Sequence, residues 1–163
     1  MGGLDTDEGE RPAQVNVGGF WIDRTEVTAA QYLAGKKAGW CSAVDSGIYD
    51  LANYEIPGKE DHPMNYVSRP KAEDYCLWVG KQLCTEAQWE KGARGGCEKN
   101  GGPSDCKAQS RKFPWGNETP TCVLVVKAFC EGQTQPVCSR SPAGDSPYGL
   151  CDMAGNAMEW VAD

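Results

Sequence analysis

Nine cysteines are the strongest chemical signal in this chain of 163 residues. They are Cys41, Cys76, Cys84, Cys97, Cys106, Cys122, Cys130, Cys138 and Cys151. No two form a C-x-x-C pair and the only histidine is His62, so the paired spacing typical of a structural zinc site is missing. Cysteines scattered through glycine- and proline-rich loops instead predict disulfides formed in an oxidising compartment. Because nine is odd, we expect one free thiol, or one partner beyond this sequence.

Two cysteine pairs are candidates for specific roles. Cys97 and Cys106 bracket a Gly-Gly-Pro turn at residues 101–103, and we predict a disulfide between them. Cys76 and Cys84 flank the predicted turn between two helices, so they are candidates for a redox pair, a structural disulfide or small buried apolar residues. Cys84 precedes a helix start, which favours a thiolate, but we favour a structural role over catalysis.

The remaining candidates for chemistry are one histidine and two carboxylates. His62 precedes a proline in a loop, and nothing in the sequence places it near a serine or cysteine, so we predict a structural role. Asp152 and Glu159 flank the Gly155-Asn156 turn. Two carboxylates placed in this way can converge with backbone carbonyls on calcium, a hard cation that takes oxygen ligands. Alternatively, Asp152 caps a turn and Glu159 is a solvated surface group.

Three helices are predicted to position these residues. The pairs Thr28–Gln31 and Thr85–Gln88 have the spacing of a capping box, which marks a helix start. Ser68 is a candidate cap for a further helix between them. Glycines follow each apolar pattern and are expected to end the helices.

Short strands are predicted among the helices. Val15, Val17 and residues 20–22 are typical of one strand, and the apolar run 123–126 of a buried one. Two or three helices with short strands and much coil indicate an α+β fold. Five tryptophans lie within the patterned segments and are predicted to pack in the core: Trp21, Trp78, Trp89, Trp115 and Trp160.

Composition and charge exclude some classes of function. The net charge is −7, and no basic cluster is present, so nucleic-acid binding is not expected. No run approaches the ~20 apolar residues that span a bilayer, so we expect no membrane span in this chain. Its length suits a single domain, residues 1–163, and we expect that domain to be incomplete at both ends.

Six segments, in order, resemble the signatures of the sulfatase-modifying-factor family, named for the formylglycine-generating enzyme. The segments are residues 20–32, 62–68, 75–90, 93–96, 114–117 and 148–160. The resemblance implies a loop-rich α+β fold like that of C-type lectins. It also implies oxidation of a sulfatase cysteine to formylglycine, with oxygen and a copper ion held by two cysteines.

The resemblance also implies which residues bind metals. Asp152, Gly155, Ala157 and Glu159 match a calcium site of the family, position by position. A second calcium site is not expected, because residues 123–139 contain a single carboxylate, Glu131. The copper cysteines of the family lie beyond residues 148–160, and none of the nine cysteines matches them. Copper is therefore expected only if a further C-terminal segment carries that pair.

Three functions remain open. The chain is part of a formylglycine-generating oxidase, a non-catalytic exported binding domain on the same scaffold, or part of a relative with different metal chemistry. We expect no catalytic residue in this chain, and a partner that is a sulfatase or another protein or peptide. The cysteines indicate a bacterial branch with an extracytoplasmic location: periplasmic, secreted or lipoprotein. Residues 117–119 also have the form of a glycosylation acceptor.

Overall fold

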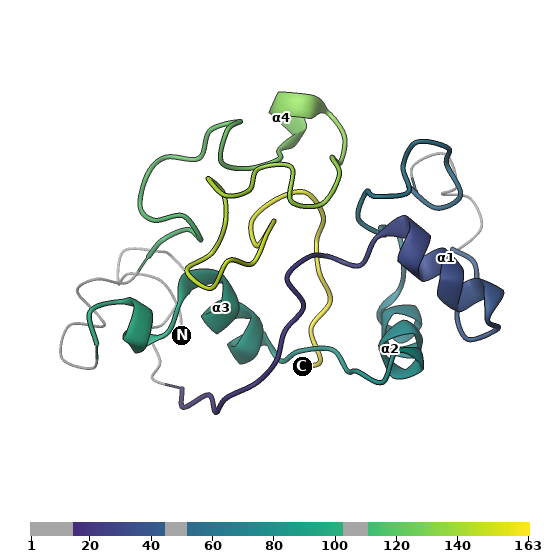
Figure 1. Cartoon of the computed structure of the whole chain (residues 1–163), viewed down its shortest axis with the longest axis horizontal. Helices are drawn as coiled ribbons and strands as arrows, with labels where there is room; N and C mark the ends of the chain where they lie inside the picture. The colour runs from purple at the N-terminus through teal and green to yellow at the C-terminus, as the bar shows by residue number, and fades with distance from the viewer. Residues whose placement is uncertain (1–14, 45–51, 103–110) are drawn as a thin grey trace.

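The computed structural model describes residues 15–44, 52–102 and 111–163, where short helices are separated by long loops (Figure 1). The helices in these ranges are α1 (Ala29–Lys37), α2 (Arg69–Trp78), α3 (Glu86–Arg94), the 3-10 helix η1 (Cys97–Lys99) and α4 (Ala128–Glu131). Strand-like pairing among the described residues is limited to three isolated bridges. They join Thr28 to Pro63, Phe113 to Gly116 and Val126 to Gly155. None of the helices in the described ranges is long and apolar enough to cross a membrane.

The predicted helix starts are confirmed. Thr28 Oγ1 accepts a hydrogen bond from the Gln31 amide at 3.2 Å, and Gln31 Oε1 accepts one from the Thr28 amide at 2.9 Å. Thr85 and Gln88 form the same reciprocal pair at the start of α3. Ser68 precedes α2 but makes no side-chain capping bond, and a proline in the first turn removes one amide that would need a partner.

Two hydrophobic clusters form the core. The first joins α1 to α2, where the rings of Tyr32 and Tyr75 stack with centroids 5.8 Å apart. Helix α1 packs closely against Cys41 and Trp78 at Gly35. A Cβ added there would lie 2.6 Å from Cys41 Sγ and 3.0 Å from the Trp78 ring. The second cluster packs Leu150 and Met153 against α3. Figure 1 shows the corresponding division, with α1 and α2 on one side and α3 and α4 on the other.

One extended segment, residues 22–28, crosses between the two clusters. Ile22 packs against the α3 cluster, and Val27 packs against the α1–α2 cluster. Hydrogen bonds hold its backbone on both sides: Arg24 O accepts from the Cys151 amide at 2.8 Å, and Val27 O accepts from the Met64 amide at 2.7 Å. Residues of this segment are therefore fixed relative to both halves of the molecule.

The strand predictions are wrong for both segments. Residues 15–22 form no strand, because none of the described residues pairs with them in a ladder. In residues 123–126, the amides of Leu124 and Val125 both donate to Thr121 O, which makes a turn. Val125 and Val126 are buried as expected, but Val123 is exposed, so the predicted burial holds for only part of the run. The helical part of the α+β prediction is confirmed, and its sheet part is not.

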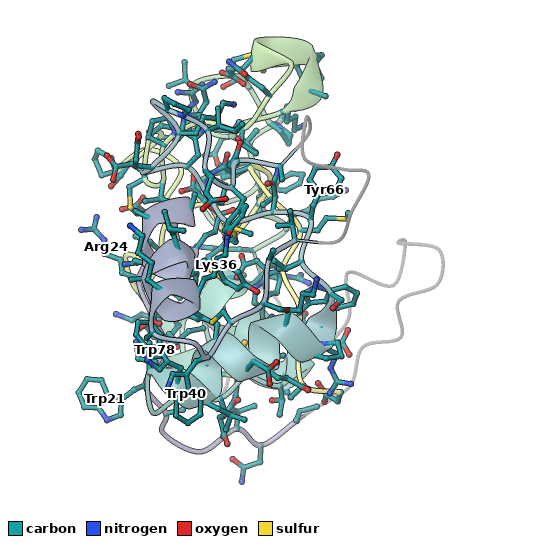
Figure 2. All side chains as sticks on the ribbon, turned by 90° about the vertical axis from the view of Figure 1, so that its right-hand side faces the viewer. Trp21, Arg24, Lys36, Trp40, Tyr66 and Trp78 are labelled. Carbon is teal, nitrogen blue, oxygen red and sulfur yellow. A yellow bond between two sulfur atoms is a disulfide. The ribbon has the colours of Figure 1, made fainter. Side chains whose placement is uncertain are left out.

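The tryptophans divide between core and surface. Trp78 and Trp89 pack against the two clusters, and Trp115 stacks on Phe113 at 5.2 Å. Trp21 is fully exposed, which corrects the core prediction, and Figure 2 shows it pointing away from the ribbon. Successive side chains of an extended backbone point to opposite sides, so burial of Ile22 turns Trp21 outward. Trp160 is also 49% exposed.

Disulfides link parts of the loop-rich half. Cys122 pairs with Cys130, which lies in α4, and Cys138 pairs with Cys151. Cys97 is disulfide-bonded as well, but Cys106 lies outside the described residues, so their predicted pairing stays a prediction. Cys41, Cys76 and Cys84 are free, more thiols than the odd count alone requires.

Candidate cation site

The loop that carries the four predicted calcium ligands lies beside the crossing segment 22–28. Three of its residues have positive φ: 55° at Asp152, 84° at Gly155 and 57° at Asn156. Glycine is required at position 155, because a Cβ there would lie 2.3 Å from Val126 O. The Asn156 amide donates to Val126 O at 3.1 Å, so the turn is pinned against a buried residue.

Asn156 connects this loop to two other segments. Its side-chain oxygen accepts from the Gln135 amide at 2.9 Å, and its Nδ2 donates to Gln135 O at 3.3 Å. The same Nδ2 donates to Glu26 Oε2 at 2.7 Å. The Ala157 amide donates to the other carboxylate oxygen, Glu26 Oε1, at 3.0 Å. Glu26 thus belongs to the candidate cation site, although no local sequence pattern indicated this.

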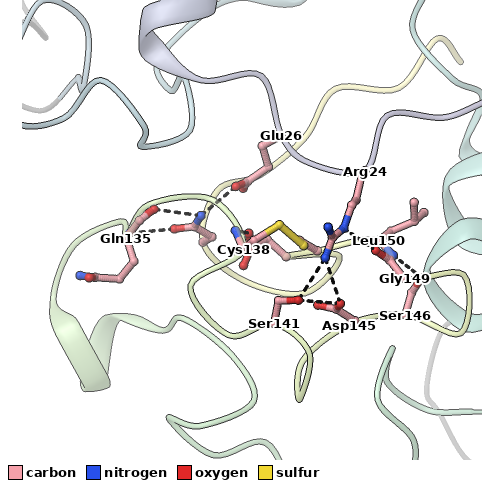
Figure 3. Close-up of a disulfide and its surroundings, with 12 residues drawn as sticks. Arg24, Glu26, Gln135, Cys138, Ser141, Asp145, Ser146, Gly149 and Leu150 are labelled. Carbon is pink, nitrogen blue, oxygen red and sulfur yellow. Dashed lines mark hydrogen bonds and ion pairs between the residues drawn. A yellow bond between two sulfur atoms is a disulfide. The ribbon is translucent and has the colours of Figure 1, made fainter.

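Asp152 is held by its surroundings. It is only 8% exposed, and its Oδ2 accepts from the Cys138 amide at 2.6 Å. The disulfide between Cys138 and Cys151 joins the same two segments, as Figure 3 shows. Next to it, Arg24 donates to Gly149 O at 3.1 Å and to Ser141 Oγ at 3.2 Å. Asp152 therefore has one carboxylate oxygen committed to the fold, as its alternative prediction of a turn-capping role requires.

The three carboxyl groups of this region all have raised pKa values. Burial, followed by the charges of Asp152 and Glu159, raises the pKa of Glu26 to about 8. Glu159 as a residue is exposed, but its carboxyl group lies against protein atoms, and this loss of hydration raises its pKa to about 7. Burial also raises the pKa of Asp152. A cation near these groups would relieve both their repulsion and their desolvation.

The four predicted ligands offer oxygen donors of the type that hard cations take. In the described part of the chain, no hydrogen bond ends on the carbonyl oxygens of Gly155 and Ala157, which leaves both available as ligands. With Asp152 and Glu159 they form an all-oxygen set of the kind that calcium takes. Among the described residues, no three His, Cys, Asp or Glu side chains are gathered to hold a metal by themselves. Any cation here would therefore depend on the backbone carbonyls.

The other predicted candidates lie apart from this loop or lack reactive character. His62 is buried, and its Nδ1 lies 3.0 Å from Thr134 Oγ1, which also contacts the Asn53 side chain. This network joins the loop around residue 62 to residue 134, in agreement with a structural role. Burial is the main cause that raises the pKa of the Cys76 and Cys84 thiols, the opposite of what a reactive cysteine needs.

Comparisons with known proteins extend over the whole chain. The family model described as "Sulfatase-modifying factor enzyme 1-like domain" matches residues 1–163. The chain is 32% identical to the formylglycine-generating enzyme of Thermomonospora curvata, covering 100% of this chain and 67% of the relative. It is 28% identical to the hercynine oxygenase of Mycolicibacterium smegmatis, covering 95% of this chain and 40% of the relative.

A relative with a different name shares the same region. The serine/threonine-protein kinase pkn1 of Chlamydia caviae is 38% identical over 66% of this chain, which is 15% of the kinase. The chain spans about two thirds of the T. curvata protein and less than half of the other two relatives. Similar domains therefore occur in proteins with three different names.

Proposed function

Because the chain belongs to the sulfatase-modifying factor enzyme 1-like family, we propose that it is the calcium-binding scaffold of a formylglycine-generating-type domain. The activity of the whole protein would be oxidation of a cysteine in a sulfatase, or in another protein or peptide, to formylglycine. The observation that supports the scaffold role is the bonding of loop 152–159 to Glu26, between the two hydrophobic clusters. The C-type-lectin-like arrangement of the complete domain is part of this proposal.

Calcium would act here as a structural ion. Asp152, Gly155, Ala157 and Glu159 would hold it, as the family resemblance implies and as the free carbonyl oxygens of Gly155 and Ala157 support. Its charge would offset the burial and the repulsion that raise the pKa values of Glu26 and Glu159. A cation that binds only the folded chain stabilises it by mass action, about 2.7 kcal/mol at a hundredfold excess over Kd.

Copper finds no matching group among the described cysteines. The family's copper cysteines lie beyond residues 148–160, and none of the nine cysteines matches them. The described residues also contain no group of three metal-binding side chains that includes Cys41, Cys76 or Cys84. We therefore assign no catalytic residue in this chain and derive no step that passes through copper.

A non-catalytic binding domain on the same scaffold is the second candidate. It is supported by the match to a protein kinase, where the similar region is a small part of a protein with another named activity. In both cases we propose an extracytoplasmic location, because disulfides such as Cys122–Cys130 and Cys138–Cys151 persist in oxidising compartments.

Thermal unfolding in calcium and in chelator tests the cation site. We expect the wild-type Tm to rise with calcium, and Asp152→Ala and Glu159→Ala each to abolish the rise by removing a charged ligand. Glu55→Ala is the matched control, because that exposed carboxylate pairs with Lys36 on the other half of the molecule. If the calcium-dependent rise in Tm persists in both ligand variants, or if calcium does not change the wild-type Tm, this loop binds no calcium.

A further inference from the structure

We propose that Glu26 is the positioning residue of the cation loop: its carboxylate clamps Asn156 and Ala157 and so holds the backbone between the ligand positions 155 and 157. The inference rests on the proposed calcium site and adds a residue from the other end of the chain, 130 positions before Asn156. Both carboxylate oxygens are used, one for the Asn156 side chain and one for the Ala157 amide. A single buried side chain thus fixes two consecutive residues of the loop.

The backbone on which Glu26 sits is itself fixed. Hydrogen bonds anchor the residue two positions before it, Arg24, and the residue after it, Val27. Thr28 then begins α1 with its capping box. Glu26 is 8% exposed, so its carboxylate has little freedom to leave the loop. These contacts make the clamp rigid, which a positioning residue requires.

Peptide geometry shows which carbonyl group is oriented by the contact with Val126 and which by the contact with Glu26. In a trans peptide unit the N–H and the C=O point in opposite directions. The Asn156 amide points at Val126 O, so the Gly155 carbonyl of the same unit points away from Val126. The Ala157 amide points at Glu26, so the Asn156 carbonyl points away from Glu26. Val126 and Glu26 therefore set the orientation of two successive peptide units, between the ligand positions 155 and 157.

The alternative is that Glu26 binds the ion directly. Its two oxygens already accept hydrogen bonds at 2.7 and 3.0 Å. A directly bound carboxylate and a clamp differ in what their loss does to the ion. Removing a ligand opens a coordination position that water fills, whereas removing a clamp weakens binding with the same number of bound waters.

Terbium, a luminescent substitute for calcium, separates these roles. We would titrate terbium and competing calcium into the wild type, Glu26→Gln, Glu26→Ala and Asn156→Ala, exciting through tryptophan. Luminescence lifetimes in light and heavy water count the waters on the bound ion. We expect each variant to weaken calcium binding by about 10- to 100-fold, as loss of outer-shell partners typically does, with an unchanged water count. Glu55→Gln, far from the loop, should bind as the wild type does.

Three results would overturn the inference in distinguishable ways. Wild-type affinity in Glu26→Gln would show that the clamp is not needed, while the calcium site itself would stand. An additional bound water in Glu26→Gln would make Glu26 a ligand. Absence of any cation binding by the wild type would remove the proposed site together with its clamp. Tm values in chelator check folding, because a purely structural loss lowers the Tm equally with and without calcium.

Discussion

At the scale of single residues, His62 makes folding sensitive to pH. Burial is the main cause that lowers its pKa below the ordinary value of 6.5, and the charge of Lys59 acts in the same direction. The unfolded chain therefore binds a proton more readily than the folded chain does. Stability from this residue is fully present above pH 6.5 and is lost as the pH falls through the lower, folded pKa.

Substitution of His62 isolates this effect. We expect the Tm of wild type minus the Tm of His62→Gln to decrease between about pH 7 and pH 5, because glutamine has no titrating group. Comparing the two proteins cancels the opposite contribution of Glu26 and Glu159, whose pKa values are raised. Parallel pH profiles would mean that His62 does not titrate differently in the folded and unfolded chains.

The candidate site was only partly predictable from single residues. Asp152 and Glu159 flank a Gly-Asn turn, so local sequence was enough to single them out. Glu26 contacts this loop across 130 and 131 positions, and no local pattern reports a contact of that kind. Its presence in the family-like segment 20–32 was the one available signal, but that signal gives no partner.

At the scale of elements, the two described disulfides should contribute unequally. They close loops with sequence separations of 8 for Cys122–Cys130 and 13 for Cys138–Cys151. Chain entropy alone then predicts losses of about 2.5 and about 2.9 kcal/mol when each pair is replaced by alanine. We expect a larger difference than this, because the second disulfide also supports the hydrogen bond from the Cys138 amide to Asp152.

Urea denaturation of the two double-alanine variants measures these losses. Each variant serves as the matched control for the other, since both remove one disulfide from the same half of the molecule. If the variant without Cys122–Cys130 is the less stable one, Cys138–Cys151 does not support the cation loop as described.

Local and long-range interactions explain which elements the sequence predicted. Helices α1 and α3 begin at capping boxes whose partners are three residues apart, so the signal lies within one turn. A strand instead needs a partner distant in sequence. Val126 forms only an isolated bridge to Gly155, and residues 15–22 form no bridge to any described residue. The apolar pattern thus predicted the burial of Val125 and Val126, but neither the exposure of Trp21 nor the backbone structure of these segments.

At the scale of the whole molecule, the described residues form two packed halves joined by the crossing segment 22–28 and the cation loop. The chain ends in an extended stretch held by α2 and α3: Arg69 donates to the carbonyls of Val161 and Ala162, and the Ala162 amide donates to Cys84 O at 2.9 Å. Among the described residues, the free thiols of Cys41, Cys76 and Cys84 have pKa values raised mainly by burial.

We therefore predict that this chain alone does not form formylglycine. The test incubates it with copper, oxygen and a peptide carrying Cys-x-Pro-x-Arg, and follows the peptide thiol by mass spectrometry with aldehyde trapping. The T. curvata relative, named a formylglycine-generating enzyme, is the positive control. We expect no aldehyde above a control without protein, because none of the nine cysteines matches the family's copper-binding pair. Specific aldehyde formation, lost on substitution of Cys41, Cys76 or Cys84, would instead place the catalytic thiol within this chain.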